Sequence, residues 1–381
     1  MEREVEVQLG RTLLEHHRRG TTYLADAEVR YPAAAYVDAQ RWAVERRRVF
    51  REHPVVVGLA SQLARPGDFV TFDLPDLPVL AVRGEDGRVR CFVNACRHRA
   101  TLLVDEPCGH ARSIVCPYHA WSYRTDGNLA AIPDPEGFVG IDPATLGLVE
   151  LASTERFGLV WAHADAPTGL DLDAYLGPGL VAELGTYGLD RHHHFRSTAI
   201  TVAANWKLMY DTFLEFYHGV YAHKATLAHL LVRNLVQFDR VGEHWRMAAA
   251  KQSIVELAER PEDDWDVTAH AVLSYDVFPN LAINLHGDHV AVYRVLPDPE
   301  RPDRSVWHFS MLTPEPVTDE RARRYFDRNF DYIVNTGMED VDIAQRIQRT
   351  LASGANESVV FGRFEPVLAW YHQRIDEALA R

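Results

Sequence analysis

The sequence has 381 residues, of which 47% are hydrophobic, 25% are charged and 10% are aromatic, and its formal net charge is −14. This length fits two domains, or one small domain set into a larger one, and the composition is that of a globular protein rather than a disordered or fibrous one. The negative charge, with no basic run interleaved with aromatics, argues against binding to nucleic acid or anionic membranes and favours an enzyme acting on small molecules.

The first residues, MEREVEVQLGRTLLEHHRRG, are rich in charge and lack the apolar core of a signal peptide. No later segment reaches the roughly 20 apolar residues that a membrane span needs. We therefore expect a cytoplasmic protein with no membrane partner.

In chain order, residues 1–50 have charged and apolar positions at helical spacing and predict an N-terminal helical segment. Short β-rich runs separated by Pro, Gly and Asp turns then predict a small all-β domain over residues 51–165. Residues 166–189 read as a connector with one short helix. The remainder has a strand at 195–204, a strongly helical stretch at 206–232, five strand-like runs between 244 and 312, and helices at 321–353 and 359–381. This order predicts an α+β fold whose second domain, residues 166–381, has an antiparallel sheet packed on helices.

Four cysteines lie within 26 consecutive residues, from Cys91 to Cys116, and the rest of the chain has none. In a cytosolic protein such crowding indicates metal ligands rather than disulfides. Residues 96–98 form C-x-H and residues 116–119 form C-x-x-H, with seventeen residues between the two motifs. A [2Fe-2S] cluster of the Rieske kind takes two thiolates on one iron and two imidazoles on the other. The predicted cluster ligands are therefore Cys96, His98, Cys116 and His119.

A zinc site is the alternative, because two cysteines and two histidines are also a common zinc set. Zinc fingers pair two like residues in each half of the motif, whereas each loop here supplies one cysteine and one histidine, which favours the iron–sulfur cluster. A second C-x-H, residues 108–110, is only five residues from Cys116, too close to form an opposing loop. Cys108 and Cys91 are expected to be ordinary buried or half-buried residues.

The segments around the two motifs, VNACRHRATLL and CPYHAWSYRTDGNL, closely resemble the cluster loops of Rieske non-haem iron oxygenases. The resemblance extends over nearly the whole chain. It implies an all-β Rieske domain and a catalytic domain of the helix-grip (START-like) type that holds a mononuclear Fe(II), with the N-terminal helical segment packed on the catalytic domain.

A candidate for the mononuclear iron site follows residues 205–207, N-W-K. Asp211, Glu215 and His218 are spaced i, i+4 and i+7, so they share one face if this stretch is a regular helix. His223 would be rotated about 140° from that face unless the helix breaks near Gly219, a residue that tolerates a break. Two histidines five residues apart are weak evidence for a metal site, and core or surface packing is the alternative.

A downstream carboxylate would complete the set, since two imidazoles and one carboxylate leave positions open on iron for O2 and substrate. Residues 337–349, GMEDVDIAQRIQR, resemble the helix from which family members supply this ligand, and matching residue by residue selects Asp340. Glu339 and Asp342 are rivals, and a solvated helix face is the alternative for all three. The resemblance thus implies His218, His223 and Asp340 as iron ligands.

The resemblance also assigns roles to neighbouring residues. Glu215 takes the place of an aspartate that bridges the two metal centres in many members, so His119, Glu215 and His218 are expected to form an electron path between chains of a head-to-tail homotrimer. Asp211 and Asn205 complete the expected catalytic set, and the alternative role of Asp211 is to set the helix. The chain has no flavin or nicotinamide motif, so electrons from NAD(P)H must come through a separate ferredoxin or reductase.

The expected function is a terminal oxygenase that hydroxylates, demethylates or dihydroxylates a small organic substrate, with aromatic hydrocarbon catabolism as one setting. The alternative is a non-catalytic Rieske electron carrier whose C-terminal domain only binds a ligand.

Several side chains stay open to two interpretations. Four arginines around the cluster loops are either ordinary ion-pair residues or a basic docking patch for an acidic redox partner: Arg97, Arg99, Arg112 and Arg124. Residues 192–194, three histidines, are not expected to chelate together, because neighbours on a strand point to opposite faces. Residues 278–280 and five aromatic residues of the iron segment are candidates for a pocket wall or for the core. The five aromatic residues are Tyr210, Phe213, Phe216, Tyr217 and Tyr221.

Overall fold

The computed structural model describes residues 1–166 and 169–381 and separates into two compact units. One unit contains Met1–Glu45, Asp173–Gly188 and His192–Arg381, and the other contains Arg46–Leu172 and Leu189–Arg191. Among the helices described, none combines the length and the apolar character needed to cross a bilayer.

The smaller unit is a β domain built on a seven-stranded antiparallel sheet in the order β2-β11-β10-β5-β4-β3-β6. Strands β2, β4 and β11 are rich in buried valine and leucine, as expected of strands that pack on a core. A second sheet of three short strands, β7-β8-β9, carries one of the two cysteine loops between β7 and β8. The strands are β2 Val55–Leu59, β3 Asp68–Leu74, β4 Leu77–Arg83, β5 Val89–Val93, β6 Cys108–His110, β7 Ile114–Val115, β8 Ser122–Tyr123, β9 Leu129–Ala131, β10 Glu150–Arg156 and β11 Leu159–His163.

The larger unit has a seven-stranded antiparallel sheet in the order β12-β18-β17-β16-β15-β14-β13. Its strands are β12 His193–Val202, β13 Leu231–Val241, β14 His244–Lys251, β15 Ala271–Val277, β16 Leu281–Leu285, β17 Val290–Pro297 and β18 Ser305–Thr313. The long helix α7, Glu320–Leu351, packs on this sheet, with the rings of Phe330 and Phe309 4.8 Å apart. The predicted α+β fold, with an all-β domain and an antiparallel sheet held against a helix, is confirmed.

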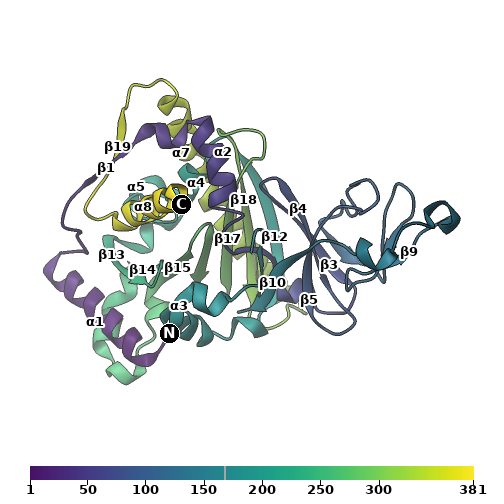
Figure 1. Ribbon diagram of the computed structural model, residues 1–381. Coiled ribbons are helices and arrows are strands. Elements are labelled where there is room, and N and C mark those ends of the chain that lie inside the picture. Colours follow the sequence, from purple (N-terminus) through teal and green to yellow (C-terminus); the bar gives the residue numbers. More distant parts are fainter. Residues whose placement is uncertain (167–168) are drawn as a thin grey trace. The chain divides into compact units, whose positions relative to one another are not determined.

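The other helices of this unit are α1 Arg3–Arg19, α3 Leu172–Gly185, α4 Trp206–Asp211, α5 Gly219–Ala222, α6 Val267–His270 and α8 Pro366–Ala380, and α2 Ala39–Arg48 spans the division between the units. Strands β1, Val29–Pro32, and β19, Ser358–Phe361, come from opposite ends of the chain and pair as a two-stranded sheet (Figure 1).

Three local predictions are wrong. The stretch 206–232 is not one helix: α4 ends at Asp211, residues 212–218 form turns, and β13 already begins at Leu231. The helix expected at 359–381 begins only at Pro366, because residues 358–361 pair with β1. Strand β1 likewise interrupts the N-terminal helical segment. In all three places, strand pairing or side-chain bonding outweighs helical periodicity. Of the expected connector, Pro167 and Thr168 lie outside the described residues.

Candidate metal centres

Helix α4 is the element that leads into the candidate iron site, and side chains fix its start. Asn205 is the N-cap, with its side-chain oxygen accepting a hydrogen bond from the Lys207 backbone N–H at 3.1 Å. The Asn205 backbone N–H donates to Gln348 of α7 at 2.8 Å, and its side-chain amide donates to the carbonyl of Pro302. All polar groups of Asn205 thus have partners in the fold, and the residue does not line the cavity described below.

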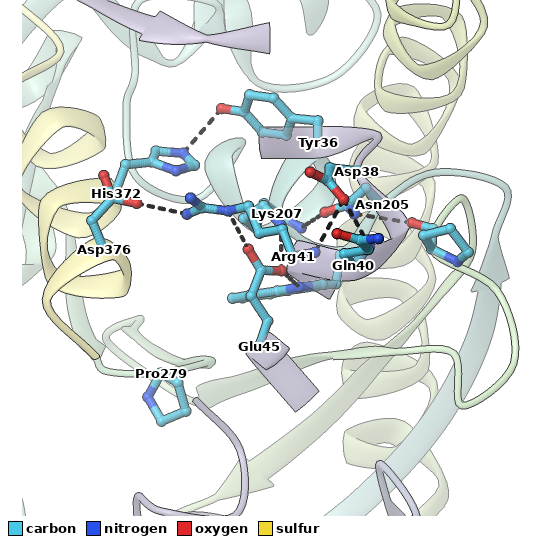
Figure 2. Close-up of polar contacts among 12 residues, drawn as sticks. Tyr36, Asp38, Gln40, Arg41, Glu45, Asn205, Lys207, Pro279, His372 and Asp376 are labelled. Atoms are coloured by element: carbon cyan, nitrogen blue, oxygen red, sulfur yellow. Dashed lines mark hydrogen bonds and ion pairs between the residues drawn. The ribbon is translucent and has the colours of Figure 1, made fainter. Parts of the chain in front are cut away.

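A buried ionic network joins α4 to the N-terminal segment and to α8 (Figure 2). The Lys207 ammonium and the Glu45 carboxylate form an ion pair in which both side chains are 0% exposed. Glu45 also accepts from the indole of Trp206 at 3.0 Å and from Arg41 at 2.8 Å, and Arg41 continues to Asp376 at 2.7 Å. Burial lowers the pKa of Lys207, and the Glu45 carboxylate opposes this. The Lys207–Glu45 pair therefore fixes the position of α4 through charges that water does not screen, whereas the Asp376 side chain at the end of the network is 47% exposed.

Asp211, the last residue of α4, takes part in a neighbouring set of hydrogen bonds. Its carboxylate accepts from the Tyr36 hydroxyl at 2.7 Å and pairs with Nε2 of His372 at 2.9 Å. His372 is completely buried, and the Tyr36 hydroxyl and His372 Nε2 are themselves 3.0 Å apart (Figure 2). Asp211 is thus held by α8 and the N-terminal segment and does not belong to the metal-ligating group.

His218, His223 and Asp340 converge. One potential ligand atom from each lies within 4.8 Å of the other two. The Nε2 atoms of the two histidines are 3.2 Å apart, and Asp340 Oδ1 is 3.2 Å from Nε2 of His223 and 3.5 Å from Nε2 of His218. His218 precedes α5 and His223 follows it, so this one-turn helix turns both rings toward the middle of α7, where Asp340 lies.

A carboxylate holds the other ring nitrogen of each histidine. Glu215 pairs with Nδ1 of His218 and also accepts from the His218 backbone N–H at 3.1 Å. Glu339 pairs with Nδ1 of His223 at 2.8 Å and accepts from the Thr226 hydroxyl at 2.7 Å. These bonds favour a proton on each Nδ1, so Nε2 is the nitrogen that each ring would offer to a metal ion. The sequence interpretation treated Glu339 only as a rival of Asp340 and missed this supporting position.

The third acidic residue of this helix segment lies elsewhere. Asp342 is 56% exposed and forms an ion pair with Arg346 at 2.7 Å one turn along α7, so it does not join the convergent group. Asp340 is 7% exposed, and its buried Oδ1 faces the Nε2 atoms of both histidines. Among the two rivals and Asp340, only Asp340 has a carboxylate oxygen at the convergence point.

The electrostatics of this group favour positive charge. Burial opposes protonation of His218, but the Glu215 and Asp340 carboxylates outweigh it and raise the His218 pKa to about 9. Burial likewise opposes protonation of His223, and the Asp340 and Glu339 carboxylates raise its pKa. A site that stabilises an extra proton in this way also stabilises a metal cation in its place.

The convergent group lines a cavity of about 360 Å³, a size typical of small-molecule sites. Of the aromatic residues proposed from the sequence, Phe213 and Phe216 line the cavity, whereas Tyr210, Tyr217, Tyr221 and residues 278–280 do not. The sequence interpretation missed the polar wall residues on strands and on α7, because nothing in their spacing relates them to the histidines: Lys251, Asn284, His286, Asp288, His289 and Tyr325.

The four predicted cluster residues lie on two loops of the β domain that share the same backbone hydrogen bond and turn conformation. The N–H of Cys96 donates to the carbonyl of Thr101, and the N–H of Cys116 donates to that of Trp121, each at 2.8 Å. In both loops the fourth residue after the cysteine, Ala100 or Ala120, has a φ of 56°, the left-handed conformation that closes a tight turn. The two loops thus present their side chains in the same way.

The side chains of these loops meet in pairs. Both cysteines are buried, and the His98 and His119 rings are 4.8 Å apart. Burial opposes ionisation of Cys116, but the backbone N–H groups of Tyr118 and His119 outweigh it and lower the thiol pKa. Nδ1 of His98 is buried with no hydrogen-bond partner. A thiol that ionises readily, near an imidazole with a free nitrogen, suits iron–sulfur ligation.

The remaining candidates are placed as follows. Cys91 is buried and its thiol pKa is raised to about 12 by burial, but Cys108 is exposed on β6, contrary to expectation. The histidines of residues 192–194 form no metal group with other described side chains.

The four arginines near the cluster loops are all exposed, and no described carboxylate lies within ion-pair distance of them, so they are not ordinary ion-pair residues: Arg97, Arg99, Arg112 and Arg124.

Two protein-family models match the sequence. "Ring hydroxylating alpha subunit (catalytic domain)" matches residues 189–381, and "Rieske [2Fe-2S] domain" matches residues 53–148. The chain is 30% identical over 241 residues to the glycine betaine monooxygenase oxygenase subunit of Chromohalobacter salexigens, an alignment that covers 62% of the chain and 50% of that protein. The chain thus spans half the length of this relative.

Two solved structures share the fold at 20% identity. One is a quaternary ammonium Rieske monooxygenase, described for carnitine oxidation and inter-subunit electron transfer, with a TM-score of 0.77 over 91% of this chain and 94% of that one. The other is naphthalene 1,2-dioxygenase from Rhodococcus sp. bound to indole, with a TM-score of 0.76 over 98% of each chain.

Proposed function

Because the chain belongs to the Rieske oxygenase alpha subunits, with their Rieske [2Fe-2S] domain and non-haem iron catalytic domain, we propose that it is a terminal oxygenase that oxidises a small organic substrate with O2. The observation that carries this proposal is the convergence of His218, His223 and Asp340 in the wall of a 360 Å³ cavity. A substrate in that cavity would lie directly beside the metal-ligating atoms.

The proposed iron ligands are Nε2 of His218, Nε2 of His223 and Oδ1 of Asp340. Two imidazoles and one carboxylate are the donor set of non-haem Fe(II) oxygenases and leave coordination positions open for O2 and substrate. The buried Oδ1 of Asp340 fits this role, because it converges with the two Nε2 atoms at a point where one metal ion would satisfy all three. When bound there, Fe(II) supplies the site of O2 activation.

Glu215 and Glu339 are proposed as positioning residues. Each holds the Nδ1 proton of one histidine and so fixes the ring with Nε2 toward the iron position. Glu215 is also the proposed bridge from His218 to the cluster ligand His119 of a neighbouring copy. Asp211 and Asn205, which we expected in the catalytic set, are proposed to act indirectly by anchoring the two ends of α4.

Cys96, His98, Cys116 and His119 are the proposed ligands of the [2Fe-2S] cluster, which supplies the electrons. We assign the cluster domain to residues 51–165 and the catalytic domain to residues 166–381, with residues 1–50 packed on the latter. The exposed arginines near the cluster loops are proposed to receive an acidic ferredoxin or reductase that carries electrons from NAD(P)H.

Electron transfer between neighbouring copies requires an assembly, for which we propose a homotrimer. A trimer mixed from Cys116→Ala and Asp340→Ala chains should recover part of the activity that each homotrimer lacks, because some neighbours pair an intact cluster with an intact iron site. A monomer with full activity contradicts this assembly.

The reaction is proposed to be hydroxylation, oxidative demethylation or dihydroxylation. The names of the relatives include both quaternary ammonium monooxygenases and aromatic-ring dioxygenases, so a place in aromatic hydrocarbon catabolism is not singled out.

The iron content distinguishes the oxygenase from the alternative, a Rieske electron carrier with a ligand-binding second domain. We expect about three iron atoms per chain in the purified protein for the oxygenase and about two for the carrier. Asp340→Ala should remove the additional iron and substrate-dependent O2 uptake while leaving the visible cluster spectrum unchanged. Two irons per chain in the fully loaded wild-type protein would exclude the proposed function.

A further inference from the structure

The cavity has a polar end formed by the β16–β17 hairpin and the first part of α7. Tyr325 and Asp340 both line the cavity from α7, and they are fifteen residues apart. At 1.5 Å per residue, this separates them by about 22 Å along the helix axis. The Tyr325 hydroxyl donates to Asp288 at 2.6 Å, so Asp288 and the hairpin around it lie at the Tyr325 end and not at the iron end.

An apolar section adjoins the iron end, where Trp307 packs against Gly337 of α7, one turn from Asp340. Its wall is formed by aromatic rings that stack on one another: Phe213 and Tyr293 have centroids 5.0 Å apart, and Tyr293 and Trp307 have centroids 6.2 Å apart. Ile333 of α7 and Leu231 of β13 also line the cavity. A ligand that reaches from one end to the other must therefore have an apolar body.

Lys251 is the only lysine or arginine among the described lining residues. It is also one of three lysines in a chain with 37 arginines, since Lys and Arg total 40. Of the other two lysines, Lys207 is paired with Glu45 and Lys224 is exposed. The Lys251 ammonium donates to the carbonyls of Ala269 at 3.0 Å and Thr268 at 3.5 Å, which leaves one of its three N–H bonds for a ligand.

No carboxylate of the described residues lies within 4 Å of the Lys251 ammonium. Asp288 lines the same end of the cavity, but it accepts from Tyr325 and pairs with Nδ1 of His289 at 2.8 Å, and its side chain is 41% exposed. The charge of Asp288 is thus shared with two donors and with water. The Lys251 ammonium is half-buried, and its hydrogen-bond partners are neutral carbonyls. Burial lowers the Lys251 pKa, and the more distant Asp266 and Asp288 carboxylates oppose this.

The neighbouring imidazoles do not compete with Lys251 for an anion. The His286 and His289 rings are stacked, with centroids 4.4 Å apart and planes at 12°. Burial lowers the His286 pKa to about 3, and the nearby His289 ring and Lys251 ammonium add to this effect. The His286 ring is therefore neutral near neutral pH. Lys251 is therefore the positive group that a ligand meets at this end.

We propose that the substrate of this cavity is an elongated, ring-bearing carboxylate. Its carboxylate pairs with Lys251, its apolar body lies along Phe213, Tyr293 and Trp307, and its opposite end reaches His218, His223 and Asp340. The inference rests on the proposed function only in taking this cavity as the substrate site. It predicts that the group to be oxidised is the end of the molecule remote from its carboxylate.

The test compares isosteric ligands that differ in charge, by calorimetric titration of the purified iron-loaded protein without reductant. The probes are 4-phenylbenzoate with 4-phenylbenzamide, and trans-4-methylcinnamate with trans-4-methylcinnamamide. The wild-type protein should bind each carboxylate at least about tenfold more tightly than its amide, in the range of a charge-assisted hydrogen bond. Equal or tighter binding of both amides would overturn the proposal.

The variants separate the charge of Lys251 from its bulk. Lys251→Met should abolish the preference for the carboxylates and change the amide Kd less than about twofold, since methionine keeps most of the apolar stem. Lys251→Arg should retain part of the preference. Lys224→Met, which removes an exposed lysine outside the cavity wall, should bind all four probes as the wild type does. An unchanged preference in Lys251→Met would place the anion elsewhere and refute the proposal.

A parallel measurement of iron per chain keeps this inference distinct from the proposed function. The Lys251→Met protein should keep the full iron content, because Lys251 is neither a proposed iron ligand nor one of the carboxylates that hold the histidines. A wild-type protein with three irons but no preference for carboxylates would refute only the substrate class. A wild-type protein with two irons and a clear preference for carboxylates would refute only the oxygenase.

Discussion

Glu339 provides the sharpest test of how the iron site is held, because it is adjacent in sequence to the proposed ligand Asp340 and yet has a different role. Its carboxylate accepts from Nδ1 of His223 at 2.8 Å and from the Thr226 hydroxyl at 2.7 Å. Glu339→Ala removes the oxygen, Oε2, that accepts both bonds. His223 is 2% exposed, so its Nδ1–H would then be buried without a partner.

The loss of Fe(II) affinity expected in Glu339→Ala can be worked out in two ways. An unsatisfied buried donor costs about 1–3 kcal/mol, which would oppose the ring orientation that iron binding requires. Loss of a hydrogen-bonded residue behind a metal-ligating histidine weakens metal affinity about 10- to 100-fold, which corresponds to roughly 1.4–2.7 kcal/mol. The two ranges overlap, so Glu339→Ala should weaken Fe(II) binding by about 10- to 100-fold. Glu339→Gln keeps an acceptor oxygen and should lose less than about tenfold.

The assay is an anaerobic titration of the additional iron against a competing chelator, with the cluster spectrum as an internal standard for intact protein. Asp342→Asn is the matched control on the same helix, because Asp342 is 56% exposed and pairs only with Arg346. This exposed pair contributes about 0–1 kcal/mol to stability and does not touch the site, so the iron affinity should not change. Equal affinities of Glu339→Ala and Asp342→Asn would refute the supporting role. Complete loss of iron in Glu339→Ala, with iron retained in Asp340→Ala, would make Glu339 the ligand.

Three further predictions follow from the contacts described. Glu215→Gln should keep the additional iron and bind substrate but fail to turn over, and wild-type cluster reoxidation in a single turnover of the pre-reduced variant would contradict the bridge. Cys116→Ala should abolish the visible cluster spectrum and destabilise the β domain, and a retained spectrum would show that Cys116 is not a ligand. Glu45→Gln should lower the free energy of unfolding by about 3–5 kcal/mol, because it leaves the buried Lys207 ammonium without its carboxylate. Urea denaturation measures this change. The double variant Glu45→Leu with Lys207→Met should recover much of the lost free energy of unfolding. A loss below about 1 kcal/mol in Glu45→Gln would show that the pair is not critical to stability.

The sequence predicts the β domain well because its signals are local. The runs at residues 55–60, 68–74, 78–84 and 158–164 alternate with turn residues and coincide with β2, β3, β4 and β11. The two cysteine loops are equally local, since each is closed by a backbone bond from the cysteine to a residue five positions later. Motif spacing is therefore sufficient to identify them.

The segment around the histidines is predicted less well, for physical reasons. Residues 206–232 have helical periodicity, but the Glu215 carboxylate accepts from the His218 backbone N–H, a local side-chain bond that competes with a continuous helix. The following strand β13 is formed by pairing with β14, which a local pattern does not reveal. The assumed common helix face of Asp211, Glu215 and His218 does not exist, although Glu215 and His218 do meet.

Packing far from the histidines determines which carboxylate faces them. Neighbouring residues on a helix point about 100° apart, so the choice among residues 339, 340 and 342 depends on how α7 lies on the sheet. A Cβ atom at Gly337 would come within 2.2 Å of the Trp307 ring, so glycine allows α7 to approach the sheet closely at that point. Asp340 is three residues further along α7. The same contact that closes the cavity wall at Trp307 therefore fixes the carboxylate at the iron position. The cluster loops depend on local turns and the iron site on long-range packing, so core substitutions near Trp307 should affect iron binding before they affect the cluster.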